Sequence, residues 1–147
     1  MMLSMQLLKS LHVFGMAMTI GGFLTSYIIT KRYQGDEGAD QGAFVASHLV
    51  AAPGLVLVIL TGFVQSFFHR FAEFKGAGYM HAKLLLVVLT VVFLAMDIRA
   101  QGVLRRSIGK GNNDAVREQC VKTRTLAGGL GLLALVLIVL LIEIRPF

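Results

Sequence analysis

Two histidines lie where a pair of metal ligands would be expected. His12 and His81 each lie a few residues into a long apolar run, the first and the third of four such runs. In an up-and-down bundle these two helices point the same way, so their imidazoles are expected at similar depth. The helices would be diagonal, roughly 11–14 Å apart, a gap that two imidazoles and an iron can bridge. The pattern predicts haem b with His12 and His81 as axial metal ligands. The alternative for each is a structural hydrogen bond across the bundle.

Three basic residues accompany these histidines. Lys9 precedes His12 by one helical turn on the same face, and Arg70 lies in the connection at the same end of the bundle. Both are expected to contact the carboxylates of a porphyrin. Lys83 follows His81 by two residues, so it either faces the same pocket or extends to the membrane surface. If Lys83 faces the pocket, it is a candidate catalytic residue.

Two further ionisable residues lie towards the opposite end. His48 enters the second apolar run from that end, and Asp97 lies near the end of the third run. Ionisable groups buried in a bilayer are usually functional, which makes both residues candidate catalytic groups. A His48–Asp97 pair can relay protons, and the alternative is a purely structural hydrogen bond between them.

The apolar runs themselves predict membrane-spanning helices. The chain has 147 residues, of which 56% are hydrophobic, and its mean hydropathy is +0.74. A helix that crosses a membrane needs about 20 mostly apolar residues. Four runs reach this length, at about 5–30, 44–68, 79–100 and 125–144, and each is too long for a strand. We predict an all-α fold, an integral membrane up-and-down four-helix bundle. Residues 1–147 form one transmembrane domain in contact with membrane lipids.

Glycine and proline residues predict where these runs turn, bend or pack closely. The glycines of 35–42 predict a turn between the first two spans, and Pro53 predicts a kink in the second. Gly15 and Gly22 are expected to leave room for a porphyrin ring. Gly21-Gly22 and the glycines of 128–131 are expected to let helices approach closely. The rest of the fourth span holds no polar residue before Glu143, so it is expected to serve packing rather than chemistry.

The distribution of charge predicts the orientation. The net charge is +6, but the basic residues lie between apolar runs rather than on one soluble face, which excludes nucleic acid as a partner. Nine of the fourteen basic residues belong to the first and third connections: Lys31, Arg32, Arg99, Arg105, Arg106, Lys110, Arg117, Lys122 and Arg124. The positive-inside rule then predicts an inner or plasma membrane protein with both termini on the outer (periplasmic) side. Cys120 is the only cysteine, so no intrachain disulfide can form.

Short segments resemble a known family. Leu8-Lys9-Ser10-Leu11-His12-Val13, Tyr79-Met80-His81-Ala82-Lys83-Leu84 and Ile144-Arg145-Pro146-Phe147 resemble HemJ-type protoporphyrinogen IX oxidases, and more loosely the CopD-like four-span families. The resemblance covers essentially the whole chain, and its most specific piece is His81-x-Lys83 opening a span. It implies a haem b protein that removes six electrons and six protons from protoporphyrinogen IX. The positions that carry over are His12, His81 and Lys83.

These observations predict a haem b membrane redox protein. Electrons would pass from a buried porphyrin substrate to a quinone or a protein partner. One alternative is a non-enzymatic electron-transfer or scaffold subunit, in a larger membrane redox complex or a homo-oligomer. A further alternative is copper or metal handling, which Met16, Met18 and Met96 suggest, although methionines in apolar helices usually serve packing.

Overall fold

The described part of the chain is helical almost throughout. A computed structural model describes residues 2–33, 37–68, 78–108 and 114–143. The elements are α1 (Met2–Arg32), α2 (Glu37–Val45), the π-helix η1 (Ala46–Ala51), α3 (Ala52–Phe68), α4 (Gly78–Ile108) and α5 (Asp114–Glu143). Because α2, η1 and α3 follow one another without a break, they form a single rod. The described residues therefore form four rods, as the apolar runs predict.

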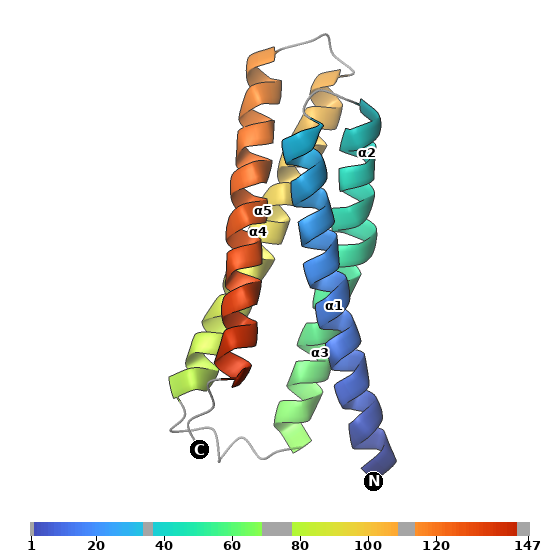
Figure 1. The fold of residues 1–147 in the computed structure, drawn as a ribbon, viewed down its shortest axis with the longest axis vertical. Helices are drawn as coiled ribbons and strands as arrows, with labels where there is room; N and C mark the ends of the chain where they lie inside the picture. The colour runs from blue at the N-terminus through green and yellow to red at the C-terminus, as the bar shows by residue number, and fades with distance from the viewer. Residues whose placement is uncertain (1, 34–36, 69–77, 109–113, 144–147) are drawn as a thin grey trace.

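The four rods alternate in direction (Figure 1). α1 begins and α5 ends at the same end of the bundle. α1 packs along η1 and α3, α4 packs along α5, and α1 also contacts α5. No comparable interface joins α1 to α4 within the described ranges, so these two helices are diagonal. The predicted all-α, up-and-down four-helix bundle is confirmed.

The surface of the bundle suits a bilayer. Among the described residues, four helical segments are long and apolar enough to cross a membrane: Gln6–Arg32, Gly38–Gln65, Leu84–Leu104 and Ala115–Leu140. Large apolar side chains such as Leu49, Phe63 and Leu84 are exposed, whereas Asp97 and Arg124 are buried. In a soluble protein, large apolar side chains are mostly buried and charged side chains mostly exposed, because water rather than lipid surrounds it. The chain thus has the character of an integral membrane protein.

The helices extend beyond the predicted spans. α2 already begins at Glu37, so Gly38 and Gly42 lie inside a helix rather than in the predicted turn. A glycine costs a helix about 1 kcal/mol relative to alanine, which tertiary contacts readily offset. At the other connection α5 begins at Asp114, so Arg124 lies within a helix rather than in a loop.

Pro53 changes the type of helix in the second rod. A proline lacks the backbone N–H, and its ring would collide with the carbonyl group of Leu49, four residues earlier. The residues before it, Ala46–Ala51, form a π-helix, in which the N–H of Ala52 donates to the carbonyl oxygen of Ser47. The predicted irregularity at Pro53 therefore takes the form of a wider helical turn, a feature that is frequent at functional sites.

Backbone contact holds α1 against the second rod. A Cβ atom added to Gly54 would lie 2.8 Å from the carbonyl oxygen of Gly15, and one added to Gly22 would lie 2.6 Å from the backbone nitrogen of Ala51. Small residues permit this close approach between membrane helices. The expectation that Gly15 and Gly22 leave room for a porphyrin ring is therefore wrong, because the backbone of the second rod lies there.

The other close approach joins α1 to α5. A Cβ atom on Gly131 would lie 2.6 Å from the ring of Phe23, and Tyr27 lies against Gly128 in the same way. The predicted close packing of the fourth span is thus confirmed at these two glycines. Phe23 belongs to the apolar core, which comprises Phe23, Ala51, Leu55, Leu94, Leu135 and Ile138.

Candidate functional site

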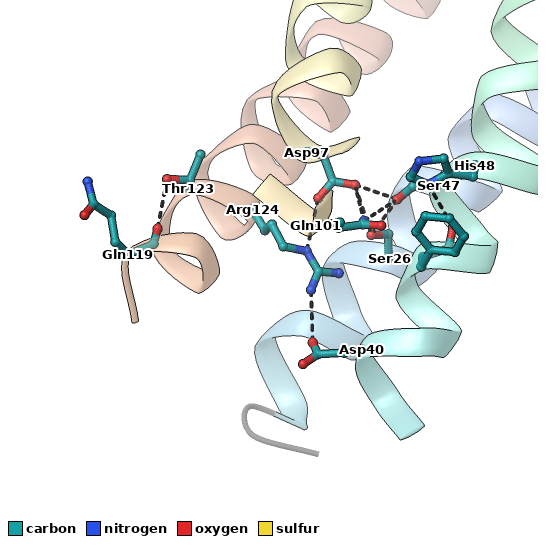
Figure 2. Close-up of polar contacts among 10 residues, drawn as sticks. Ser26, Asp40, Ser47, His48, Asp97, Gln101, Gln119, Thr123 and Arg124 are labelled. Carbon is teal, nitrogen blue, oxygen red and sulfur yellow. Dashed lines mark hydrogen bonds and ion pairs between the residues drawn. The ribbon is translucent and has the colours of Figure 1, made fainter. Parts of the chain in front are cut away.

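Polar side chains from all four rods meet inside the bundle (Figure 2). They are Ser26 of α1, Asp40 of α2, Ser47 of η1, Asp97 and Gln101 of α4, and Arg124 of α5; we call these six residues the Asp97 network. Five of the six are buried, and the side chain of Asp40 is 18% exposed. The network lies in the half of the bundle away from the start of α1. Charged groups inside a membrane bundle are costly, so this cluster is the strongest functional candidate in the described structure.

The carboxylate of Asp97 accepts hydrogen bonds from several donors. Its Oδ2 accepts from Oγ of Ser47 at 2.5 Å and from Nε2 of Gln101 at 2.9 Å. Its Oδ1 lies 3.3 Å from Nε of Arg124. Oγ of Ser26 is 2.9 Å from Oγ of Ser47 and extends the network to α1. These donors satisfy a charge that would otherwise be very costly to remove from water.

Arg124 joins two carboxylates on different helices. While its Nε faces Asp97, its Nη1 lies 3.0 Å from Oδ1 of Asp40. The planar guanidinium carries five N–H donors, so it can bridge groups on two sides. Arg124 thereby links α5 to both α4 and α2. With all three groups ionised, two negative charges face one positive charge, which leaves one negative charge in excess.

Two polar atoms of the network remain without a hydrogen-bond partner in the part of the chain that the structure describes. They are Nη2 of Arg124, a donor, and Oε1 of Gln101, an acceptor. Both atoms are buried away from bulk solvent. Buried groups of this kind are usually satisfied by an ordered water or a ligand. The network therefore has hydrogen-bonding capacity beyond what its own residues use.

The local sequence explains how these side chains converge. Asp97 and Gln101 are four residues apart, so they share one face of α4. Ser47 lies in the π-helix next to Pro53, and its side chain is buried towards Asp97. The small side chains of Ser26 and Ser47 let three rods come together around the carboxylate.

His12 lies at the opposite end of α1 from the Asp97 network and is half-buried. Its Nδ1 is 2.8 Å from Oγ1 of Thr61 on α3, and its ring lies against Gly62. The hydroxyl of Thr61 donates to the carbonyl oxygen of Leu57 at 2.6 Å. When the Thr61 hydroxyl donates to the carbonyl of Leu57, its oxygen can accept an N–H from Nδ1 of His12. In that tautomer the ring lone pair of His12 is on Nε2.

The other residues predicted for the haem site lie in different settings. His81 lies near the start of α4 and is exposed, and Lys9 on α1 is also exposed. Lys83 lies in the next turn of α4 after Tyr79. Arg70 lies outside the described residues. The structure therefore brings His12 together with Thr61, and it places His81 on the diagonal helix.

His48 does not join Asp97. Its Nδ1 donates to the carbonyl oxygen of Phe44 at 3.2 Å, and the two rings stack with centroids 3.8 Å apart. The neighbouring residue Ser47 bonds to Asp97 instead (Figure 2). The expected His48–Asp97 pair is therefore wrong, because η1 turns Ser47 rather than His48 towards the carboxylate.

Sequence reasoning missed most of the Asp97 network. Ser26, Ser47 and Gln101 are uncharged, and the charge distribution assigns Arg124 to the basic third connection. In the structure Arg124 is only 1% exposed, so it is not a loop charge. A usable indication was present: Arg124 directly precedes a long apolar run, a position that a helix starting a few turns earlier would bury.

No group of three or more histidine, cysteine, aspartate or glutamate side chains is placed to hold a metal ion within residues 2–33, 37–68, 78–108 and 114–143. Comparison with protein-family models, with curated proteins and with solved structures finds no match to this chain.

Proposed function

We propose that this chain is an integral membrane redox protein that binds haem b through His12 and His81. The observation that carries the proposal is the 2.8 Å hydrogen bond between Nδ1 of His12 and Oγ1 of Thr61. A histidine that binds a metal commonly donates its other ring N–H to a fixed acceptor, which sets the tautomer and the ring orientation. Thr61 provides such an acceptor, so His12 fits the requirement for an axial ligand.

The helix arrangement gives further support. α1 and α4 are diagonal, and the α1–α3 pair and the α4–α5 pair diverge towards the end at which both α1 and α4 begin (Figure 1). A diagonal pair suits two imidazoles with an iron between them better than neighbouring helices do. His81 is exposed at this end and is thus accessible to an incoming ligand.

The residues of the chain would each have a defined role. His12 and His81 would hold the iron, and Lys9, Lys83 and Arg70 would provide cations for the propionates. The haem supplies a reversible one-electron couple when it is bound. Electrons would come from a lipid-soluble donor such as a porphyrinogen and go to a quinone or a membrane redox partner. Protoporphyrinogen IX oxidation as the specific reaction rests on the family resemblance alone.

Absorption spectroscopy tests the proposal directly. The protein is purified in detergent from haem-replete cells, and spectra are taken oxidised and after dithionite reduction. We expect the Soret and α bands of a low-spin b-type haem, which His12→Ala and His81→Ala each remove. His48→Ala is the matched control, because its imidazole bonds to the carbonyl of its own helix and should leave the bands unchanged. A colourless wild-type preparation refutes the haem proposal.

We also propose that both termini lie on the outer side of an inner or plasma membrane. Without Arg124, eight basic residues of the first and third connections still outnumber five on the other side, as the positive-inside rule requires. Reporter fusions at the C-terminus and within residues 109–113 test this. A periplasm-active reporter should work only at the C-terminus, and the reverse result refutes the orientation.

A further inference from the structure

We propose that the Asp97 network is a proton-binding site that exchanges protons with the membrane surface through Asp40. Two carboxylates share one guanidinium here, with Arg124 Nε facing Asp97 and Nη1 facing Asp40. The excess negative charge lies in a region that lipid surrounds, where an uncompensated charge is unfavourable. Uptake of one proton by either carboxylate removes that excess, because the other then pairs with Arg124 alone.

The network can accommodate Asp97 in both protonation states. As a carboxylate, Asp97 accepts from Nε2 of Gln101 at 2.9 Å. A protonated Asp97 carries an O–H, which needs an acceptor instead. Rotation of the Gln101 amide by half a turn presents Oε1, and that atom has no partner in the described structure. The reaction is the simple addition of H⁺ to a carboxylate oxygen, and the new O–H donates to Oε1 of Gln101.

The route to the surface begins at Asp40. Asp40 is the only member of the network that is partly exposed. The guanidinium of Arg124 contacts both Asp40 and Asp97. Nη2 of Arg124 is buried and has no partner among the described residues, so it can hold a water next to the ion pairs. A proton taken up at Asp40 can reach Asp97 through such water, while Arg124 shifts its pairing from one carboxylate to the other.

Among the residues that the structure describes, few other titratable groups lie near this carboxylate. α5 contributes Arg124 and, one turn before it, the buried thiol of Cys120. α2 contributes Asp40, whereas α1 and η1 contribute only the hydroxyls of Ser26 and Ser47. The imidazole of His48 is engaged with the carbonyl of Phe44. Proton uptake in this region is therefore assigned to Asp97 and Asp40.

Infrared difference spectroscopy of the full-length protein in lipid tests the site. Spectra are compared between mildly acidic and mildly alkaline buffers, in H₂O and in D₂O. We expect a carboxylic acid C=O band that shifts to lower frequency in D₂O and disappears in Asp97→Asn. Glu118→Gln is the matched control, because Glu118 lies on the surface of α5 and pairs with Lys122. Its substitution should leave the band unchanged.

Further variants keep the test decisive. If Asp97→Asn does not fold, Ser47→Ala replaces it, and loss of this hydroxyl should shift the band frequency. Absence of a band in the wild type, a band that survives Asp97→Asn, or an unshifted band in Ser47→Ala each refutes the proposal. A band that sodium suppresses, relative to choline, would identify a sodium site and also refutes it. His12→Ala should keep the band, so this test is independent of the haem proposal.

Discussion

Arg124 and Asp97 form a buried ion pair between α5 and α4, with Nε and Oδ1 3.3 Å apart. Two residues earlier on α5, Lys122 forms a shorter ion pair with Glu118, at 2.7 Å, but both of those side chains are largely exposed. The shorter distance does not make the exposed pair the more stabilising of the two, because water screens its charges. Removal of one partner from the buried pair leaves the other charge without its counter-ion, away from water. The two pairs thus provide a matched comparison on one helix.

We predict that Arg124→Met destabilises the bundle by about 3–5 kcal/mol, as expected when one partner of a buried pair is removed. Both Asp97 and Asp40 lose their cation in this variant. Reversible unfolding in mixed detergent micelles measures the effect. Lys122→Met, the control, should change the unfolding free energy very little. Equal effects of the two substitutions would contradict the importance of burial.

We predict that Gly54→Ala destabilises the protein by about 1–3 kcal/mol, the range for overpacking a tight interface. The added methyl group would lie 2.7 Å from Cβ of Met18 and 2.8 Å from the carbonyl oxygen of Gly15, so α1 and the second rod must separate. Gly21→Ala is the control, since a Cβ there meets nothing within 4 Å. The same unfolding measurement distinguishes the two variants. A neutral Gly54→Ala would show that the backbones are not in contact.

We predict that Thr61→Val lowers the affinity for haem by about 10- to 100-fold, the usual effect of removing the group that orients a metal-binding histidine. Valine keeps the shape but cannot accept the N–H of His12. Titration of haem-free protein with haemin, followed by the Soret band, measures the affinity. Thr90→Val is the control, because the buried hydroxyl of Thr90 donates only to the carbonyl of Leu86 in its own helix. An equal loss of haem affinity in both variants would show that Thr61 does not orient His12 for haem binding.

We predict that Pro53→Ala changes the hydrogen bonding of Asp97 indirectly, through the position of Ser47. Alanine restores an N–H at position 53, which can donate to the carbonyl of Leu49 and convert the π-turn to an ordinary α-helical turn. Ser47 would then rotate away from the carboxylate. The carboxylic acid band should shift in the same direction as in Ser47→Ala. An unchanged band would show that the π-helix does not position Ser47.

The sequence predicts the bundle well but the site poorly. Length and uniform hydropathy determine that four helices cross a membrane, since a bilayer tolerates almost no other arrangement of this chain. The up-and-down order favours a diagonal placement of the first and third helices, which the contacts of the described helices confirm. The sequence predicts Asp97 as a functional candidate, because a carboxylate near the end of an apolar run is rare. The sequence does not predict its partners, because Ser26, Ser47 and Gln101 are uncharged polar residues that only the tertiary structure brings together.

The sequence by itself determined the membrane bundle, its up-and-down order and the two histidines at one end. Only the tertiary structure decided which neighbour each polar group faces. A shift of one residue in a helix turns a side chain by about 100°, so the π-turn before Pro53 selects Ser47 over His48 as the partner of Asp97. Likewise, only the early start of α5 places Arg124 inside the bundle between Asp97 and Asp40.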